Sequence, residues 1–109
     1  MNPIIPTHFA ARAQIIKAMG HATRLFLVHE LEHGEQCVCD LQAKVGSDLS
    51  TVSRHLAVLR NAGIIASRKE GNQVFYRLEC PCVLSFFECV ERVLASKQAE
   101  SLQQLVGRS

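Results

Sequence analysis

The residues best suited to chemistry are the five cysteines of this sequence, Cys37, Cys39, Cys80, Cys82 and Cys89. Four of them form two Cys-x-Cys pairs, in the stretches CVC and CPC. In a reducing compartment, clustered cysteines favour metal binding or redox chemistry over structural disulfides, and an odd number cannot pair completely within one chain. Free cysteine is also a common small core residue, so for Cys89, which lies in an apolar stretch, packing and function are equally good interpretations.

Length and hydropathy bound the class of protein. The chain of 109 residues suits one domain over residues 1–109, and its 48% of hydrophobic residues allow a real core. The longest apolar run is far shorter than the roughly 20 residues of a membrane span. The start, MNPIIPTHF, lacks the features of a signal peptide. We therefore expect a cytoplasmic protein, without a membrane partner, whose cysteines are reduced.

Positive charge is concentrated between Ser50 and Leu78, where five basic residues accompany one acidic residue, although the net charge of the chain is only +2. A basic segment in a nearly neutral protein is typical of proteins that contact phosphate. On charge alone, a solvated basic face is an equally good interpretation.

Hydrophobic spacing predicts helices over residues 7–19, 21–33, 38–45 and 50–62, each followed by a glycine. Thr23 is expected to cap the second helix. Alternating residues on both sides of Gly71-Asn72 predict a β-hairpin. Pro81 is expected to begin a last helix that continues past Lys97 toward Val106. This order predicts a mainly α protein with a β-hairpin, the winged helix-turn-helix fold.

The last predicted helix has a wide apolar stripe, formed by Val83, Phe86, Phe87, Val90, Val93 and Leu94. A small domain has little core left to cover such a stripe, so we expect a homodimer held together by its terminal helices. The alternative is that the stripe packs on its own domain.

The fourth predicted helix buries Val52, Leu56 and Leu59 and therefore exposes hydroxyl, arginine and histidine side chains on its opposite face. Hydroxyls and helix N-termini bind phosphates, and arginine reads guanine in the major groove. The tip of the hairpin is expected to lie near the flanking backbone or minor groove. The predicted contacts to double-stranded DNA are Ser50, Thr51, Ser53, Arg54, His55, Arg60, Arg68, Lys69 and Gln73.

Four stretches together are specific: KAMGHATRLFLVHEL (17–31), EQCVCDL (35–41), STVSRHLAVLRNAGII (50–65) and SRKEGNQVFYRL (67–78). Through them the sequence resembles the ArsR/SmtB family of metal-responsive bacterial repressors, from about Ile15 to Leu94. The resemblance implies a homodimer on a palindromic operator that releases DNA when a metal or metalloid binds.

In this resemblance, CVCDL matches the metal-binding box at the start of the third helix. Arsenic-responsive members have three thiolates there, whereas the third position of this chain is Gln42. Trivalent arsenic and antimony prefer three sulfurs. Because residues i and i+2 of a regular helix point about 160° apart, Cys37 and Cys39 can share an ion only if the helix start unwinds or Cys37 precedes it.

The third donor is expected to be Cys80 or Cys82, from the same subunit or its partner. Cys89 and His8 are weaker candidates. By resemblance, the CPC pair aligns with an Asp-x-His pair of a zinc site in other members, but the second pair of that site aligns with Val93 and Ser96. Neither residue is a useful zinc ligand, so we expect this inter-subunit zinc site to be lost.

Three functions follow from these residues. The first is a repressor that senses trivalent arsenic or antimony at Cys37, Cys39 and Cys80 or Cys82. The second is the same repressor sensing cadmium, lead or zinc, or thiol oxidation. The third, a thiol enzyme, is disfavoured because no βαβ unit, activating His/Asp arrangement or glycine-rich phosphate loop accompanies the cysteines.

Overall fold

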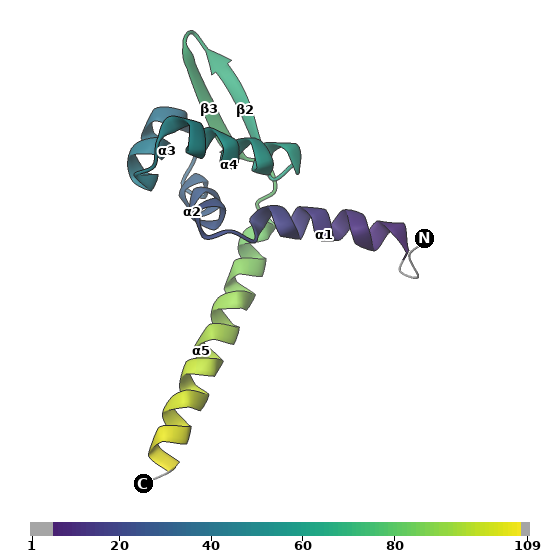
Figure 1. The fold of residues 1–109 in the computed structure, drawn as a ribbon, viewed down its shortest axis with the longest axis vertical. Helices are drawn as coiled ribbons and strands as arrows, with labels where there is room; N and C mark the ends of the chain where they lie inside the picture. Colours follow the sequence, from purple (N-terminus) through teal and green to yellow (C-terminus); the bar gives the residue numbers. More distant parts are fainter. Residues whose placement is uncertain (1–5, 108–109) are drawn as a thin grey trace.

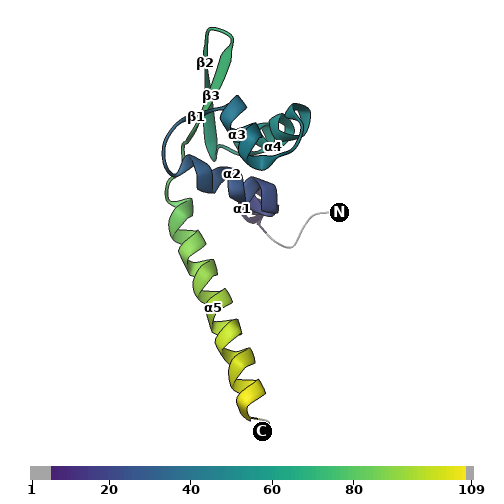
Figure 2. The ribbon, with the colours of Figure 1, turned by 90° about the vertical axis from the view of Figure 1, so that its left-hand side faces the viewer.

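The computed structural model describes residues 6–107, with side chains as far as residue 104. In this part of the chain the elements are, in order, α1 (Thr7–Met19), α2 (Ala22–Leu31), β1 (Gln36–Cys37), α3 (Val38–Val45), α4 (Leu49–Asn61), β2 (Ile65–Glu70), β3 (Gln73–Leu78) and α5 (Val83–Gly107). A compact body of α2, α3, α4 and the sheet carries the β2–β3 hairpin as a wing, and α1 and α5 project from it (Figures 1 and 2). This is the predicted winged helix-turn-helix.

One core holds the body together. Its fully buried side chains come mainly from α2, α3, α4 and the start of β2: Leu27, Val28, Leu41, Val52, Leu56, Leu59 and Ile65. The prediction that α4 buries Val52, Leu56 and Leu59 is thus confirmed. For α2, the apolar spacing of Leu25, Val28 and Leu31 predicted a buried face. Val28 and Leu31 are buried, but Leu25 is 40% exposed and Leu27 fills the core instead.

Several predicted helix boundaries shift by one or two residues. His21, not Thr23, caps α2, because its imidazole accepts a hydrogen bond from the Thr23 N–H. Asp48 precedes α4, which begins at Leu49 rather than Ser50. Pro81 does not begin α5: it occupies a turn in which the Val83 N–H donates to the Cys80 carbonyl, and the helix starts at Val83.

The sheet has the order β1-β3-β2 and is antiparallel throughout. The hairpin forms as predicted, with Gln73 paired to Glu70 across the Gly71-Asn72 turn. Gly71 has φ 61°, as the first central position of a type II′ turn requires. The short strand β1 was not predicted from the sequence, and it places Cys37 beside Phe75 of β3.

The two terminal helices extend the molecule. Its radius of gyration is 17.9 Å, whereas a compact chain of this length has about 13 Å. The α5 helix packs on the core only near its start, where Val83 is buried, while Phe86, Val93 and Leu94 are each more than half exposed. Within residues 6–107, no helix is sufficiently long and apolar to cross a membrane.

Candidate nucleic-acid interface and thiol sites

The N-terminal end of α4 presents the hydroxyls predicted to contact DNA. Ser50 is exposed and Thr51 half-buried, and both hydroxyls donate hydrogen bonds to the carboxylate of Asp48. These two hydrogen bonds hold the pKa of Asp48 below its ordinary value. Ser53 is half-buried, whereas Arg54 and Arg60 are exposed. The arginines are therefore the freely accessible cations of this helix.

His55 belongs to a cluster that joins α4 to α2. Its ring lies 4.4 Å from the His21 ring, centroid to centroid, and its Nδ1 lies 3.2 Å from a guanidinium nitrogen of Arg24. Arg24 also donates to the carbonyl of Ala18 at the end of α1. Burial first, and then the charges of His21, Arg24 and Arg54, lower the pKa of His55. His55 thus has a structural role in addition to the predicted contact with DNA.

Arg68 in the wing is held by carboxylates. Its guanidinium bonds both oxygens of Glu35, with a shortest distance of 2.6 Å, and donates to Glu70 at 2.6 Å. It also lies 4.6 Å from the ring centroid of Phe75. The hydrogen bonds that Arg68 donates to Glu35 and then to Glu70 raise the pKa of Arg68, and the same arginine lowers the pKa of Glu35. A phosphate that binds Arg68 must therefore compete with two carboxylates.

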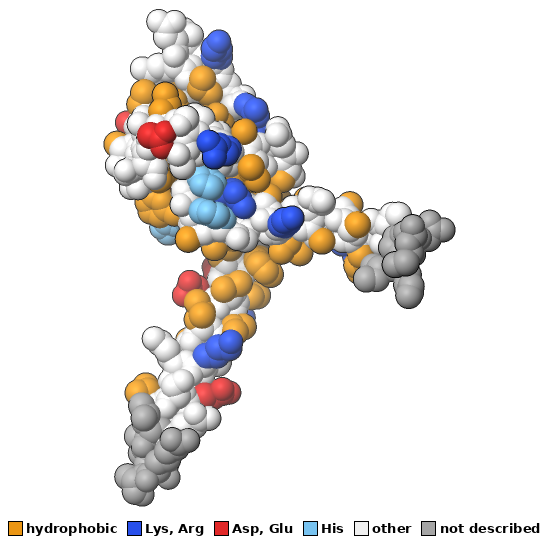
Figure 3. Space-filling model, in the orientation of Figure 1, with side chains coloured by type: hydrophobic (Ala, Val, Ile, Leu, Met, Phe, Trp, Pro, Cys, Tyr) orange, Lys and Arg blue, Asp and Glu red, His pale blue; other side chains and the backbone are white. Residues whose placement is uncertain are grey.

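The other predicted wing residues, Lys69 and Gln73, are exposed near the hairpin tip. Figure 3 shows Lys and Arg side chains along the hairpin and over α2 and α4, where they adjoin histidine side chains. Among the described residues, Arg54, Arg60 and Lys69 form no ion pair. Helix and wing thus present unpaired cations in the positions that the sequence predicted.

The first thiol pair lies where β1 meets α3. Cys37 is extended, with φ −78° and ψ 157°, and its Sγ accepts a hydrogen bond of 3.4 Å from the N–H of Asp40. Cys39 is exposed on the first turn of α3. Cys37 therefore precedes the helix, which is one of the two arrangements that the spacing required for a shared ion.

A polar brace fixes this segment to α2. The ammonium group of Lys44 on α3 donates to Gln36 at 2.7 Å and to Glu30 at 3.1 Å, and the amide of Gln36 donates to the carbonyl of Glu30 at 2.7 Å. The hydrogen bond from Lys44 is the main cause of the lowered pKa of Glu30. The residue just before Cys37 is thereby tied to both helices.

The second thiol pair lies between β3 and α5. The sulfurs of Cys80 and Cys82 are 2.9 Å apart and share a hydrogen bond, which raises the pKa of the Cys80 thiol. Cys37 lies opposite Phe75 in the sheet, whereas Cys80 and Cys82 follow the end of β3 at Leu78. Residues 6–107 contain no group of three or more His, Cys, Asp or Glu side chains that could hold a metal. Within one chain, the two cysteine pairs are thus separate, and Cys89 is exposed on α5.

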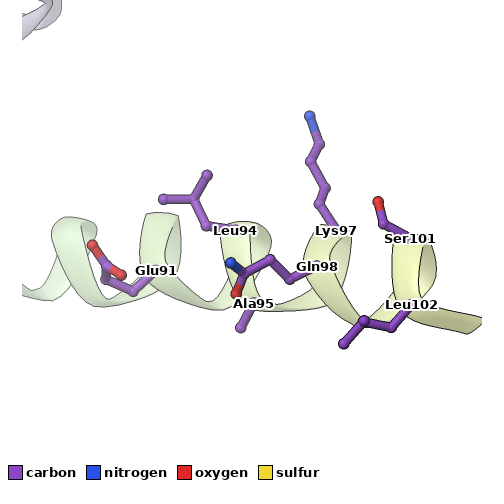
Figure 4. Close-up of a pocket in the computed structure, with 7 residues that line it drawn as sticks. All are labelled: Glu91, Leu94, Ala95, Lys97, Gln98, Ser101 and Leu102. Atoms are coloured by element: carbon purple, nitrogen blue, oxygen red, sulfur yellow. The ribbon is translucent and has the colours of Figure 1, made fainter.

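An apolar groove of about 670 Å³ lies between α1, α2 and α5. Its lining includes Ile16, Met19, Leu25, Phe86 and Val90, and hydrophobic side chains fill the angle between α1 and α5 in Figure 3. A second hollow, from Glu91 to Leu102, is lined by α5 alone, with side chains that spread from one helix (Figure 4). Of the stripe predicted for a dimer surface, Val83 and Phe87 pack on the body of their own chain, whereas Phe86, Val90, Val93 and Leu94 are exposed.

Sequence reasoning missed five residues that contact the predicted DNA-binding side chains: His21, Arg24, Glu35, Asp48 and Glu70. The N-cap position of Asp48 could have been recognised, since aspartate before a helix is a standard signal. Glu35 and Arg68 are brought together only by the pairing of β1 and β2 with β3, and no spacing in the sequence indicates it.

The fold places the chain in the class of winged helix-turn-helix proteins, and comparison with known proteins identifies the family. Residues 21–67 match the bacterial regulatory protein family arsR. The chain belongs to this arsR family. It therefore groups with transcriptional regulators and not with enzymes.

Relatives of this chain are named for different functions. The arsenical resistance operon repressor of Escherichia coli is 44% identical over 71 residues, 64% of this chain and 61% of that protein. The biofilm growth-associated repressor of Agrobacterium fabrum is 44% identical over 66 residues, 61% of this chain and 56% of the relative. A homologue of the cadmium resistance regulator CadC from Staphylococcus aureus is 41% identical over 68 residues, 62% of this chain and 56% of its own. The match thus spans less than two thirds of these relatives.

Solved structures share the fold over more of the chain. HlyU from Vibrio cholerae has a TM-score of 0.70 and 31% identity, covering 82% of this chain and 97% of HlyU. A homodimeric winged helix-turn-helix DNA-binding domain from Mycobacterium bovis has a TM-score of 0.71 and 29% identity, covering 86% of each chain.

Proposed function

We propose that the protein is a homodimeric transcriptional repressor that binds operator DNA and releases it when trivalent arsenic or antimony binds cysteine thiolates. In this proposal α4 enters the major groove with Arg54 and the hydroxyls beside it, and Lys69 and Gln73 approach the flanking backbone. The exposed, unpaired cations of α4 and the wing support the DNA contact. A cytoplasmic location, where the thiols stay reduced, is part of the proposal.

One observation carries the inducer site: Cys37 lies in an extended conformation immediately before α3, while Cys39 lies on its first turn. The two sulfurs are therefore not constrained to opposite sides of one regular helix. A soft ion that prefers sulfur fits this donor set. Because the described residues of one chain bring no third ligand to Cys37 and Cys39, the third thiolate would come from Cys80 or Cys82 of the partner subunit.

The residues around Cys37 couple ligand binding to the DNA-binding helix. The Cys37 sulfur caps α3 through Asp40, and the neighbouring Gln36 is braced to α2 and α3. Sharing an ion with Cys39 draws the Cys37 sulfur away from the Asp40 N–H, so the first turn of α3 loses this cap. Since α3 packs against α4, this change raises the free energy of the DNA-binding arrangement.

The test is operator binding titrated with arsenite, using a duplex that the protein selects from random DNA. We expect arsenite to weaken binding about 10- to 100-fold. Cys37→Ser and Cys39→Ser variants should keep operator binding and lose this response, whereas Cys89→Ser, the matched control, should respond like the wild type. A Cys37→Ser variant that still leaves DNA normally would contradict the proposed site.

A second candidate keeps the repressor and changes the signal to cadmium, lead or zinc, or to thiol oxidation. The similarity to the CadC homologue supports a divalent soft metal, and the adjacent sulfurs of Cys80 and Cys82 support oxidation. Titration of the same complex with cadmium, lead, zinc and hydrogen peroxide separates these signals. Release by cadmium but not arsenite would replace the first proposal with this one.

A further inference from the structure

The CPC pair occupies the joint between the wing and α5. Just before it, the Glu79 N–H donates to the carbonyl of Ile64 at 2.9 Å, and the Cys80 N–H donates to the same oxygen at 3.3 Å. After it, the Val83 and Ser85 N–H groups donate to the carbonyls of Cys80 and Cys82, each at 3.2 Å. These hydrogen bonds hold both cysteines in a turn that sets how α5 leaves the body (Figure 1).

Within this turn, the two sulfurs are already in contact. The Sγ atoms are 2.9 Å apart, and a disulfide of about 2.05 Å requires them to approach by roughly 0.9 Å. Two residues of chain span at most about 7 Å, so the Cα separation in a turn suits a bridge. Cys82 is exposed and Cys80 is half-buried, so an oxidant reaches Cys82 first.

The CVC pair has the same spacing as the CPC pair and can be compared with it in the same chain. There, Cys37 is directed to the N–H of Asp40, and Cys39 lies inside a helix. No contact joins the Cys37 and Cys39 sulfurs, which both lie in the described part of the chain. The two pairs have the same spacing, so the local backbone conformation, and not the spacing, determines whether their sulfurs meet.

We propose that Cys80 and Cys82 form a reversible intrachain disulfide when a hydroperoxide oxidises the protein, and that this bond acts as a switch at the base of α5. The Cys82 thiolate attacks the O–O bond, forming a sulfenic acid and releasing the alcohol, or water from hydrogen peroxide. The Cys80 sulfur then attacks the Cys82 sulfur, and the hydroxyl leaves as water with the proton of the Cys80 thiol. Two thiols and one hydroperoxide thus give one disulfide, one alcohol and one water.

The chemistry is tested by peptide mapping of the full-length Cys89→Ser variant after brief exposure to hydrogen peroxide and blocking of free thiols. Trypsin places Cys80 and Cys82 on residues 78–92 and Cys37 and Cys39 on residues 25–44, so each pair is read on its own peptide. We expect the 78–92 peptide to lose two hydrogens about tenfold faster than the 25–44 peptide, because its sulfurs are already positioned, and dithiothreitol to restore it. Equal rates, or a bond from Cys80 or Cys82 to another chain, would overturn the proposal.

The expected effect of the disulfide on DNA binding rests on the proposed function and is measured separately, as operator affinity. Because the bond fixes the turn from which α5 departs, it alters how two subunits present α4, and we expect the oxidised Cys89→Ser protein to bind operator several-fold more weakly than the reduced protein. A variant that also carries Cys80→Ser and Cys82→Ser should lose this peroxide effect. Unchanged operator affinity with the disulfide formed would overturn the switch, and a failure of reduced protein to bind any duplex would instead count against the proposed function.

Discussion

At the scale of single residues, several predicted DNA contacts are already occupied by neighbouring carboxylates. Asp48 holds the hydroxyls of Ser50 and Thr51, and Glu35 and Glu70 hold Arg68. In the proposed complex with DNA, phosphate oxygens would replace these carboxylates. Binding DNA would therefore exchange hydrogen bonds to carboxylates for hydrogen bonds to phosphates, and this exchange lowers the net affinity for DNA. Specificity then depends on how well the positions of these side chains match the DNA.

Releasing Arg68 should strengthen binding to DNA. In a Glu35→Gln, Glu70→Gln variant the guanidinium no longer has to leave two carboxylates, and two negative charges near the duplex are removed. We expect operator affinity to rise several-fold and the slope of log K against log salt to steepen by about one phosphate contact. Fluorescence anisotropy at several salt concentrations measures both quantities. An unchanged affinity in the double variant would show that Arg68 does not meet phosphate.

His55 should make stability depend on pH. Its pKa is lowered in the folded protein from an ordinary value of 6.5, so the unfolded chain binds its proton first as pH falls. The free energy of unfolding should then decrease below about pH 6.5, by up to about 1.4 kcal/mol per pH unit, and be restored above it. Urea unfolding from pH 8 to 5 tests this.

Two histidine variants assign that pH dependence. His55→Gln removes the titrating group that packs between His21 and Arg24, so its profile should be flatter than that of the wild type. His33→Gln changes an exposed histidine and should follow the wild-type profile. Equal profiles for the wild type and His55→Gln would mean that another group causes the loss of stability.

At the scale of elements, the helix-turn-helix depends on the glycine that ends α3. Gly46 has φ 81° and its N–H donates to the carbonyl of Gln42, which makes it a left-handed C-cap. A Cβ placed there meets nothing within 4 Å, so a substitution changes only the backbone energy. The turn between the two helices is therefore set by conformation and not by packing.

Gly46→Ala should cost about 1 kcal/mol of unfolding free energy, because alanine disfavours the left-handed region. Gly20 also follows a helix, but with φ −80°, and the nearest atom to an added Cβ is 3.4 Å away. Gly20→Ala should therefore be neutral or slightly stabilising. Chemical denaturation compares the two variants directly, and equal losses would refute the conformational explanation.

At the scale of the whole molecule, a single chain leaves much of its apolar surface exposed. The α1 and α5 helices project from the body and expose apolar residues such as Ile16 at 57% and Leu94 at 52%. Contiguous exposed apolar surface on a small protein marks an interaction site. In the proposed homodimer, a second copy covers the groove between α1, α2 and α5 and spaces the two α4 helices for a palindromic operator.

A charge in this surface should separate the subunits. Leu94→Glu places a carboxylate within the apolar stripe, where burial of an unpaired charge is costly, so we expect a monomer that no longer binds operator tightly. Ala99→Glu introduces the same side chain on the opposite face of α5 and should stay dimeric. Sedimentation equilibrium measures the mass of each variant. A dimeric Leu94→Glu protein would show that α5 is not the interface.

Sequence by itself determined the order of elements, the hairpin and the buried face of α4, because local periodicity, caps and turn residues express them directly. The sequence also indicated Cys37 and Cys39 as candidate ligands of one ion, although it left open whether Cys37 lies inside the helix. The two residues that pair as β1, Gln36 and Cys37, are too few to give a periodic signal, so the extended conformation of Cys37 could not be predicted.

Only the tertiary structure decided which groups meet. Strand pairing brings Glu35 to Arg68, helix packing brings His21 and Arg24 to His55, and a hydrogen-bonded turn joins the sulfurs of Cys80 and Cys82 while the equally spaced Cys37 and Cys39 make no such contact. The reason is physical: spacing along a chain specifies local backbone conformation, whereas contacts between distant residues depend on how whole elements pack together.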